Sequence, residues 1–287
     1  MTAANRVKLP VSLYFVATPI GTARDITLRA LDVLASADVL VAEDTRSLRR
    51  LMEIHGVALE GRPLVSYHEH SASSAREKLL KALADGKSVA YASEAGTPLI
   101  ADPGFQLGRA AREAGFEVTA APGATAAITA LTISGLPSDS FFFAGFAPNA
   151  SGQRQTFFRS VSDIPGTLIF YESPNRIAKS IKDMASVFGG DRHAVIAREL
   201  TKKFEEVLSG TLADLAAQLE TRKLKGEIVV LVTRPEKAVI DEAALEALLG
   251  TALETQSVKD AVADVMQETG MPRRQIYQLA LKLEKEK

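Results

Sequence analysis

The stretch Leu13-Tyr14-Phe15-Val16-Ala17-Thr18-Pro19-Ile20-Gly21 indicates the fold class of the first half of the chain. Its first five residues form an apolar run with the length of a buried strand, and the Thr, Pro and Gly that follow are typical of a turn. A helical pattern comes next, with Thr27 in the N-cap position and Leu28, Leu31 and Leu34 on one face. A strand, a turn and a helix in this order predict one βα unit of a parallel sheet.

The same alternation continues along the chain as far as residue 137. Further strands are predicted at residues 38–42, 63–67, 88–92 and 116–120, and helices at residues 48–55, 74–84 and 103–114. Short strands that alternate with helices predict a parallel sheet with helices on both faces. We therefore expect residues 1–137 to form an N-terminal α/β domain.

A second unit and a helical tail are predicted beyond that point. Strands are expected at residues 141–144, 167–171, 193–197, 205–209 and 227–233, and helices at residues 153–160, 177–188 and 212–219. Residues 138–236 are therefore expected to form a C-terminal α/β domain with a mixed sheet. Residues 237–287 show only helical patterns, and helices at 257–268 and 272–284 predict a helix-turn-helix-like tail, a helical hairpin.

The composition is that of an ordinary globular protein. The 287 residues are 46% hydrophobic and 24% charged, and no apolar run approaches the roughly 20 residues of a membrane span. The N-terminus lacks the apolar core of a signal peptide, and the absence of cysteine excludes disulfides and thiolate metal sites. We therefore expect a cytoplasmic protein that does not bind membranes. A protein that binds RNA through bulk charge would be strongly basic, so a net charge of −1 means that any RNA binding needs a local patch.

Three turns at the carboxyl ends of predicted strands have the composition of a ligand site. They comprise residues 18–21, residues 93–98 with 102–104, and residues 122–126. Ligands of open α/β sheets bind at these strand ends. Gly and Ala let the backbone approach a ligand, Pro fixes a loop, and Ser and Thr hydroxyls can bond a ribose or a carboxylate. One such turn alone is often structural, but three at one sheet edge favour a nucleoside-type cofactor.

A series of motifs runs in order from about residue 13 to residue 233. The motifs include Ala17-Thr18-Pro19-Ile20-Gly21, Ala42-Glu43-Asp44-Thr45-Arg46, Ala95-Gly96-Thr97-Pro98-Leu99-Ile100-Ala101-Asp102-Pro103-Gly104, Phe170-Tyr171-Glu172-Ser173-Pro174, Ala197-Arg198-Glu199-Leu200-Thr201-Lys202 and Lys225-Gly226-Glu227. Together they resemble the ribosomal small-subunit methyltransferase I family, and the tail resembles the helix-turn-helix appendage of many members. This family is part of the tetrapyrrole methylase superfamily of class III methyltransferases.

The resemblance implies both a fold and an activity. It implies two α/β domains with S-adenosylmethionine (SAM) in the cleft between them, usually in a homodimer. The implied reaction is 2′-O-methylation of a cytidine ribose in the decoding region of 16S rRNA, with that RNA or the 30S subunit as partner. The sequence departs from the family pattern at Glu94, where Asp is common, at Asn175, where His is common, and at Ala124-Thr125, where Pro-Ser or Pro-Cys is usual.

Individual residues have expected roles in catalysis and in cofactor binding. A 2′-hydroxyl is a poor nucleophile that a carboxylate can orient or deprotonate, so Glu43, Asp44 and Glu172 are the predicted catalytic residues. Acids after a strand are also favoured by a helix dipole, which leaves a structural role open. The predicted cofactor-binding residues are Pro19, Ser93, Glu94, Ala95, Gly96, Thr97, Pro98, Asp102, Gly123, Ala124, Thr125, Tyr171, Lys225 and Gly226.

Arginines are the predicted RNA contacts, because a guanidinium can hold a phosphate. They are Arg24, Arg46, Arg49, Arg273 and Arg274. Arg273 and Arg274 lie in the first turn of a predicted tail helix, which can equally be part of a dimerisation or capping hairpin. No metal site is predicted, because His68 and His70 are too few ligands for zinc.

Two other functions remain open at this point. One is a methylase of a small molecule such as a porphyrinoid, with the same fold and cofactor. The other is a nucleic-acid adaptor without enzymatic activity, built around the C-terminal helices. The longer Gly-rich turn of porphyrinoid methylases is missing after the first strand, and the Gly96-Thr97-Pro98 loop argues against a pure adaptor.

Overall fold

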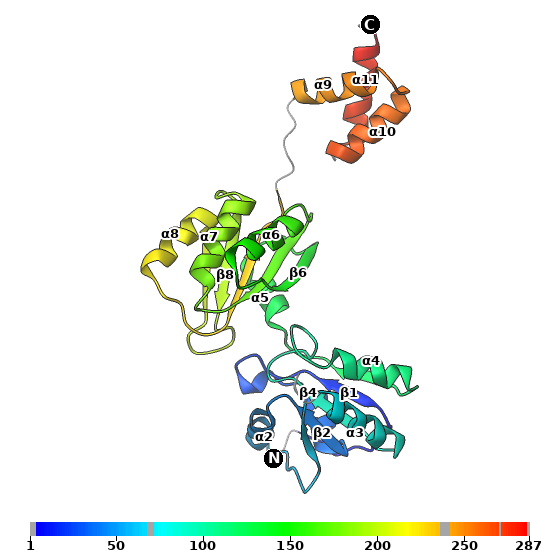
Figure 1. Ribbon diagram of the computed structural model, residues 1–287, viewed down its shortest axis with the longest axis vertical. Coiled ribbons are helices and arrows are strands. Elements are labelled where there is room, and N and C mark those ends of the chain that lie inside the picture. Colours follow the sequence, from blue (N-terminus) through cyan, green and yellow to red (C-terminus); the bar gives the residue numbers. More distant parts are fainter. Residues whose placement is uncertain (1–3, 68–71, 236–241, 270, 286–287) are drawn as a thin grey trace. The chain divides into compact units, whose positions relative to one another are not determined.

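The computed structural model describes residues 4–67, 72–235, 242–269 and 271–285. The chain divides into two compact units, Met1–Arg234 and Pro235–Lys287. The first unit contains two five-stranded sheets, and the second contains helices (Figure 1). None of the helices in the described ranges is both long and apolar enough to cross a bilayer.

The first sheet is parallel throughout, as predicted. Its order is β3-β2-β4-β1-β5, and the turns that follow β1, β2, β4 and β5 meet at one edge because these strands end in register. Val16 of β1 is paired with Ala92 of β4 and with Ala121 of β5. The strands are β1 (Leu13–Val16), β2 (Val39–Ala42), β3 (Leu64–Ser66), β4 (Val89–Ala92) and β5 (Val118–Ala121).

Helices cover both faces of this sheet. α1 (Leu28–Ser36) and α2 (Thr45–Ile54) pack on one face, and α3 (Ala72–Ala84) and α4 (Phe105–Glu113) pack on the other. Thr27 caps α1 as predicted, since its side chain accepts a hydrogen bond from the backbone N of Ala30 at 3.1 Å. α2 begins at Thr45 rather than at residue 48, because Asp44 caps it in the same way. A short 3-10 helix, η1 (Ala23–Asp25), precedes α1.

The second sheet is mixed, which confirms that prediction. Its order is β6-β7-β10-β8-β9. β6 is parallel to β7, and the other neighbouring pairs are antiparallel. The strands are β6 (Phe141–Phe146), β7 (Thr167–Glu172), β8 (His193–Arg198), β9 (Glu206–Thr211) and β10 (Ile228–Val232).

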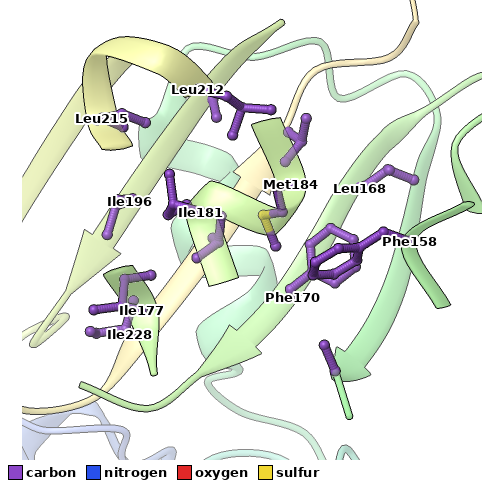
Figure 2. Packing of buried hydrophobic residues seen from close by; sticks show 14 of the residues in the cluster. Phe158, Leu168, Phe170, Ile177, Ile181, Met184, Ile196, Leu212, Leu215 and Ile228 are labelled. Atoms are coloured by element: carbon purple, nitrogen blue, oxygen red, sulfur yellow. The ribbon is translucent and has the colours of Figure 1, made fainter. Parts of the chain in front are cut away.

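Different helices cover the two faces of the second sheet. α6 (Ser151–Val161), α7 (Ile177–Phe188) and α8 (Leu212–Thr221) bury one face around Phe158, Phe170 and Met184 (Figure 2). The Phe158 and Phe170 rings pack edge to face, with centroids 5.4 Å apart. α5 (Ala126–Ser134) follows β5 of the first sheet but packs on the other face of the second sheet, with Ala130 and Leu131 against Ile169 and Val195. The segment from β5 to α5 therefore joins the two sheets.

The described residues of the second unit form three helices. α10 (Val258–Thr269) and α11 (Arg273–Lys285) confirm the two predicted tail helices, and α9 (Glu242–Ala252) is an addition to the predicted hairpin. Leu249 of α9, Val262 of α10 and Ile276 of α11 are completely buried in one small core. Two amphipathic helices leave an apolar face uncovered, and in this unit α9 covers it.

Candidate functional site

The three turns predicted to form a ligand site lie together and are cross-linked. Thr18 and Gly96 exchange two backbone hydrogen bonds, of 2.9 and 3.0 Å. The Thr97 hydroxyl donates to the backbone oxygen of Ala124 at 2.9 Å. The turn after β4 is therefore bonded to the turn after β1 and to the turn after β5, and the three form one rigid surface.

A cavity of about 620 Å³ opens between this surface and the second sheet. This volume is within the range of pockets that hold small organic ligands and cofactors. Most of the predicted cofactor-binding residues line the cavity, and so does one predicted catalytic residue, Glu172. The predicted cofactor-binding residues on its wall are Pro19, Glu94, Ala95, Gly96, Thr97, Asp102, Thr125, Tyr171 and Gly226.

The other predicted cofactor-binding residues are not among the described residues that line the cavity. Ser93 accepts a hydrogen bond from Thr18, and its own hydroxyl donates to the backbone oxygen of Gly96. Gly123 packs so closely on Ala17 that a Cβ at Gly123 would lie 2.8 Å from the Ala17 side chain. Pro98, Ala124 and Lys225 complete this group, and their contact with a cofactor stays a prediction.

Asp102 is the carboxylate with the most unusual surroundings. It lines the cavity, and its Oδ2 atom is buried without a hydrogen-bond partner among the described residues. Burial, and then the negative charges of Glu43 and Glu94, raise the pKa of Asp102 to about 6. An ionised Asp102 at neutral pH therefore needs a cationic or hydrogen-bonding partner from a ligand.

The loop around Asp102 is strained. Leu99 and Ala101 have φ angles of 72° and 63°, in the left-handed region that side chains other than glycine rarely adopt. Tyr91 holds the loop by donating a hydrogen bond from its hydroxyl to the backbone oxygen of Pro103 at 2.8 Å. Strain of this kind persists only where the surrounding structure enforces it, and it occurs often at ligand sites.

The predicted catalytic acids have different surroundings. Asp44 caps α2 by accepting from the backbone N of Arg46 at 2.8 Å, and its bonds to Arg46 lower its pKa. Glu43 and Asp44 are not among the described residues that line the cavity. Glu172 has a side chain that is only 1% exposed, and its Oε1 atom lies 3.2 Å from Nε of Arg176. Catalytic roles for these three acids stay predictions.

The second sheet supplies one wall of the cavity. The Tyr171 hydroxyl accepts a hydrogen bond from the backbone N of Ala127 at 3.3 Å, and burial raises the pKa of Tyr171. Lys202, a weaker functional candidate from the sequence together with Glu199, lies on the wall and pairs with Glu199 at 2.9 Å and Glu227 at 2.7 Å. The motif at residues 197–202 was the signal for it. Other lining residues, which lie outside the motifs and turns singled out in the sequence, are Ser47, Phe146, Ile228 and Val229.

The predicted RNA-binding arginines are spread over both units. Arg46 lines a second, smaller cavity beside the first, and Arg49 is exposed on the same helix. Arg24 lies in η1, and Arg273 and Arg274 are exposed at the start of α11. Contact of these arginines with RNA stays a prediction. His68 and His70 lie outside the described residues.

Comparisons with known proteins give the relationships of the chain. A family model described as Tetrapyrrole (Corrin/Porphyrin) Methylases matches residues 12–216, and one described as RsmI C-terminal HTH domain matches residues 239–284. A Mesorhizobium japonicum protein named Ribosomal RNA small subunit methyltransferase I is 45% identical over 96% of this chain and 93% of its own length. A Haemophilus influenzae protein of the same name is 41% identical over 94% of this chain and 96% of its own length.

Solved structures show the same fold at low sequence identity. A cobalt precorrin-4 methyltransferase matches with a TM-score of 0.59 and 16% identity, over 78% of this chain and 95% of that chain. A diphthine synthase matches with a TM-score of 0.60 and 15% identity, over 77% of this chain and 90% of that chain. Taken with the family models and the curated relatives, these matches show that the chain belongs to the tetrapyrrole methylase family and, within it, to the ribosomal RNA small subunit methyltransferase I family.

Proposed function

We propose that this chain transfers a methyl group from SAM to the 2′-hydroxyl of a cytidine ribose in the decoding region of 16S rRNA. The observation that carries the proposal is the cavity between three cross-linked turns and the second sheet. Asp102 lies on its wall, with a carboxylate oxygen that has no hydrogen-bond partner in the described part of the chain. The name of the relatives, Ribosomal RNA small subunit methyltransferase I, supports rRNA as the substrate.

SAM is the methyl donor of this family, and the residues of the cavity suit it. SAM is a nucleoside with a cationic sulfonium and an amino-acid end, and a buried carboxylate oxygen without a partner is stabilised by such a cation. Small residues at positions 95–97 leave room for a ligand next to the backbone, and Ile228 and Val229 provide an apolar wall. We therefore expect Asp102 to face a cationic part of the cofactor.

The chain's own contribution to the reaction is alignment and exclusion of water. The donor supplies an activated methyl group with a good leaving group, so positioning the acceptor accounts for most of the catalysis. The cross-links between the turns hold that surface rigid before any ligand binds. Glu43, Asp44 and Glu172 remain the predicted groups for orienting or deprotonating the 2′-hydroxyl.

The test is methylation with tritiated SAM and purified substrates. The protein is incubated with 30S subunits, with naked 16S rRNA and with 50S subunits as the control, and ribose methylation is then mapped along the labelled RNA. We expect label in the small-subunit RNA only, on the 2′-oxygen of a cytidine. Label that enters a precorrin mixture but no RNA would overturn the proposal in favour of a small-molecule methylase. The expected homodimer is checked separately by light scattering.

A further inference from the structure

A second cavity lies directly beside the cofactor cavity. Its volume is about 450 Å³, and it is formed by α2 and by the turns after β1 and β4. Four residues belong to the walls of both cavities, namely Pro19, Gly21, Ser47 and Glu94. A ligand in the second cavity would therefore be separated from a bound cofactor by no more than this shared wall.

The second cavity has a cationic side. Arg46 and Arg50 are four residues apart, so they lie on the same face of α2, and both line the cavity. Their side chains are 91% and 75% exposed. Arg46 pairs with Asp44 at 3.3 Å and Arg50 with Glu53 at 3.8 Å, but exposed pairs of this kind are weak and do not prevent a guanidinium from binding a phosphate.

The same cavity also has an apolar side. Leu51 and Ile54 continue the lining along α2, and Pro19 faces them from the turn after β1. Ile54 is 51% exposed, so its side chain is accessible to a ligand in this cavity. Glu94 is the acidic residue among the described residues that line the second cavity, and it lies on the wall shared with the cofactor cavity. Two arginines and an aliphatic surface in one cavity match the two ends of a nucleotide.

We propose that the second cavity holds a nucleotide of a single-stranded RNA substrate, with a phosphate on Arg46 and Arg50 and a base against Leu51 and Ile54. This inference rests on the proposed function. A nucleotide held there would direct its ribose to the shared wall, beside the cofactor. Single-stranded RNA is recognised in this manner, because its unstacked bases can enter a pocket.

Three arginines on α2 differ in their position relative to the cavity. Arg46 and Arg50 line the cavity, whereas Arg49, between them in sequence, is exposed and is not among the described lining residues. Replacing any one of them by Ala removes the same charge from α2. The comparison therefore distinguishes a pocket from a diffuse basic surface, because only a pocket makes the position of the charge matter.

The experiment measures binding of a labelled 16S rRNA decoding-region fragment at several salt concentrations. We expect Arg50→Ala to weaken binding about tenfold and to reduce the salt slope by about one, because one phosphate contact is lost. Arg49→Ala is expected to weaken binding less than about twofold, because Arg49 does not line the cavity; in this inference Arg50 takes the place of Arg49 among the RNA contacts predicted from the sequence. Ile54→Asn should weaken binding while the salt slope stays the same, since it affects a base contact and not a phosphate contact. SAM affinity by calorimetry and thermal unfolding show that each variant is folded.

The outcomes separate this inference from the proposed function. If Arg49→Ala and Arg50→Ala weaken RNA binding equally, α2 contributes only diffuse charge and the pocket is overturned. If the wild-type protein methylates RNA and the three variants bind it as well as the wild type does, the pocket is overturned and the function stands. If the wild-type protein neither binds nor methylates RNA, both are overturned.

Discussion

Replacing Asp102 by Asn should make the ligand-free protein more stable at neutral pH and weaken its binding of SAM. The carboxylate of Asp102 is partly buried, has one oxygen without a partner among the described residues, and lies near Glu43 and Glu94. Each of these features disfavours its ionised form. The variant keeps the size and shape of the side chain but cannot ionise, so it removes the charge and replaces one acceptor oxygen by an NH2 donor.

The sign and size of the stability effect follow from the pKa. The pKa of Asp102 rises from the ordinary 3.8 to about 6, so between these values the native state binds its proton more tightly than the unfolded chain does. Stability therefore falls as pH rises through this window and stays at its lower value above it. A pKa that is about two units higher corresponds to a loss of about 3 kcal/mol in unfolding free energy when Asp102 ionises. Because solvent screens this partly exposed group, we expect a loss of about 1–2 kcal/mol.

The assay is urea unfolding of both proteins without ligand from about pH 4.5 to about pH 7. The advantage of Asp102→Asn should grow by about 1 kcal/mol over this range. Asp85→Asn, the same change at an exposed aspartate, is the control and should follow the wild type. Calorimetry at neutral pH should show SAM affinity reduced about tenfold, as expected for loss of a charged hydrogen-bonding partner. Parallel stability profiles for wild type and Asp102→Asn, together with unchanged SAM affinity, would contradict this prediction.

Three further predictions concern other parts of the molecule. Glu172→Gln should lower the unfolding free energy by about 1–3 kcal/mol, because it removes the buried partner of Arg176; a large loss of turnover with an unchanged urea midpoint would instead favour catalysis. Gly96→Val should lower stability by about 2 kcal/mol or more as well as SAM affinity, because Gly96 has φ of 80° and a Cβ there would lie 3.2 Å from the Ile20 side chain; unfolding curves that match the wild type would contradict this. Changing Arg273 and Arg274 together to Ala should weaken RNA binding and flatten its salt dependence without altering SAM affinity, and an unaltered salt slope would make α11 purely structural.

Much of the fold could be predicted because its signals are local. The apolar run at 13–17 and the turn after it predict β1 and its carboxyl end, and both are observed. Thr27 predicts the start of α1, because a side-chain oxygen satisfies a free backbone N–H of the first turn wherever the helix later packs. α5 shows the limit of such signals. Its packing on the second sheet depends on Ile169 and Val195, which come later in the chain, so no local pattern reveals it.

The sequence indicated where the candidate site lies but did not reveal the role of each residue in it. Turns at the ends of parallel strands must meet at one edge, so the grouping of residues 18–21, 93–98 and 122–126 followed from their order alone. The order of the turns did not reveal which acid has unusual surroundings in the folded protein. Asp44 and Asp102 both come after strands, yet the first is an N-cap bonded to Arg46 and the second faces a cavity with an unpaired oxygen.

Caps, turns and apolar periodicity act between near neighbours, so the sequence alone predicts most of the strands and helices and the parallel edge, and its motifs carry the family resemblance. The electrostatic state of the site depends on the tertiary structure. Burial and the charges of Glu43 and Glu94 act on Asp102 through space, from turns that follow different strands. Such effects depend on distance and solvent access in the folded molecule, and spacing along the chain does not reveal them.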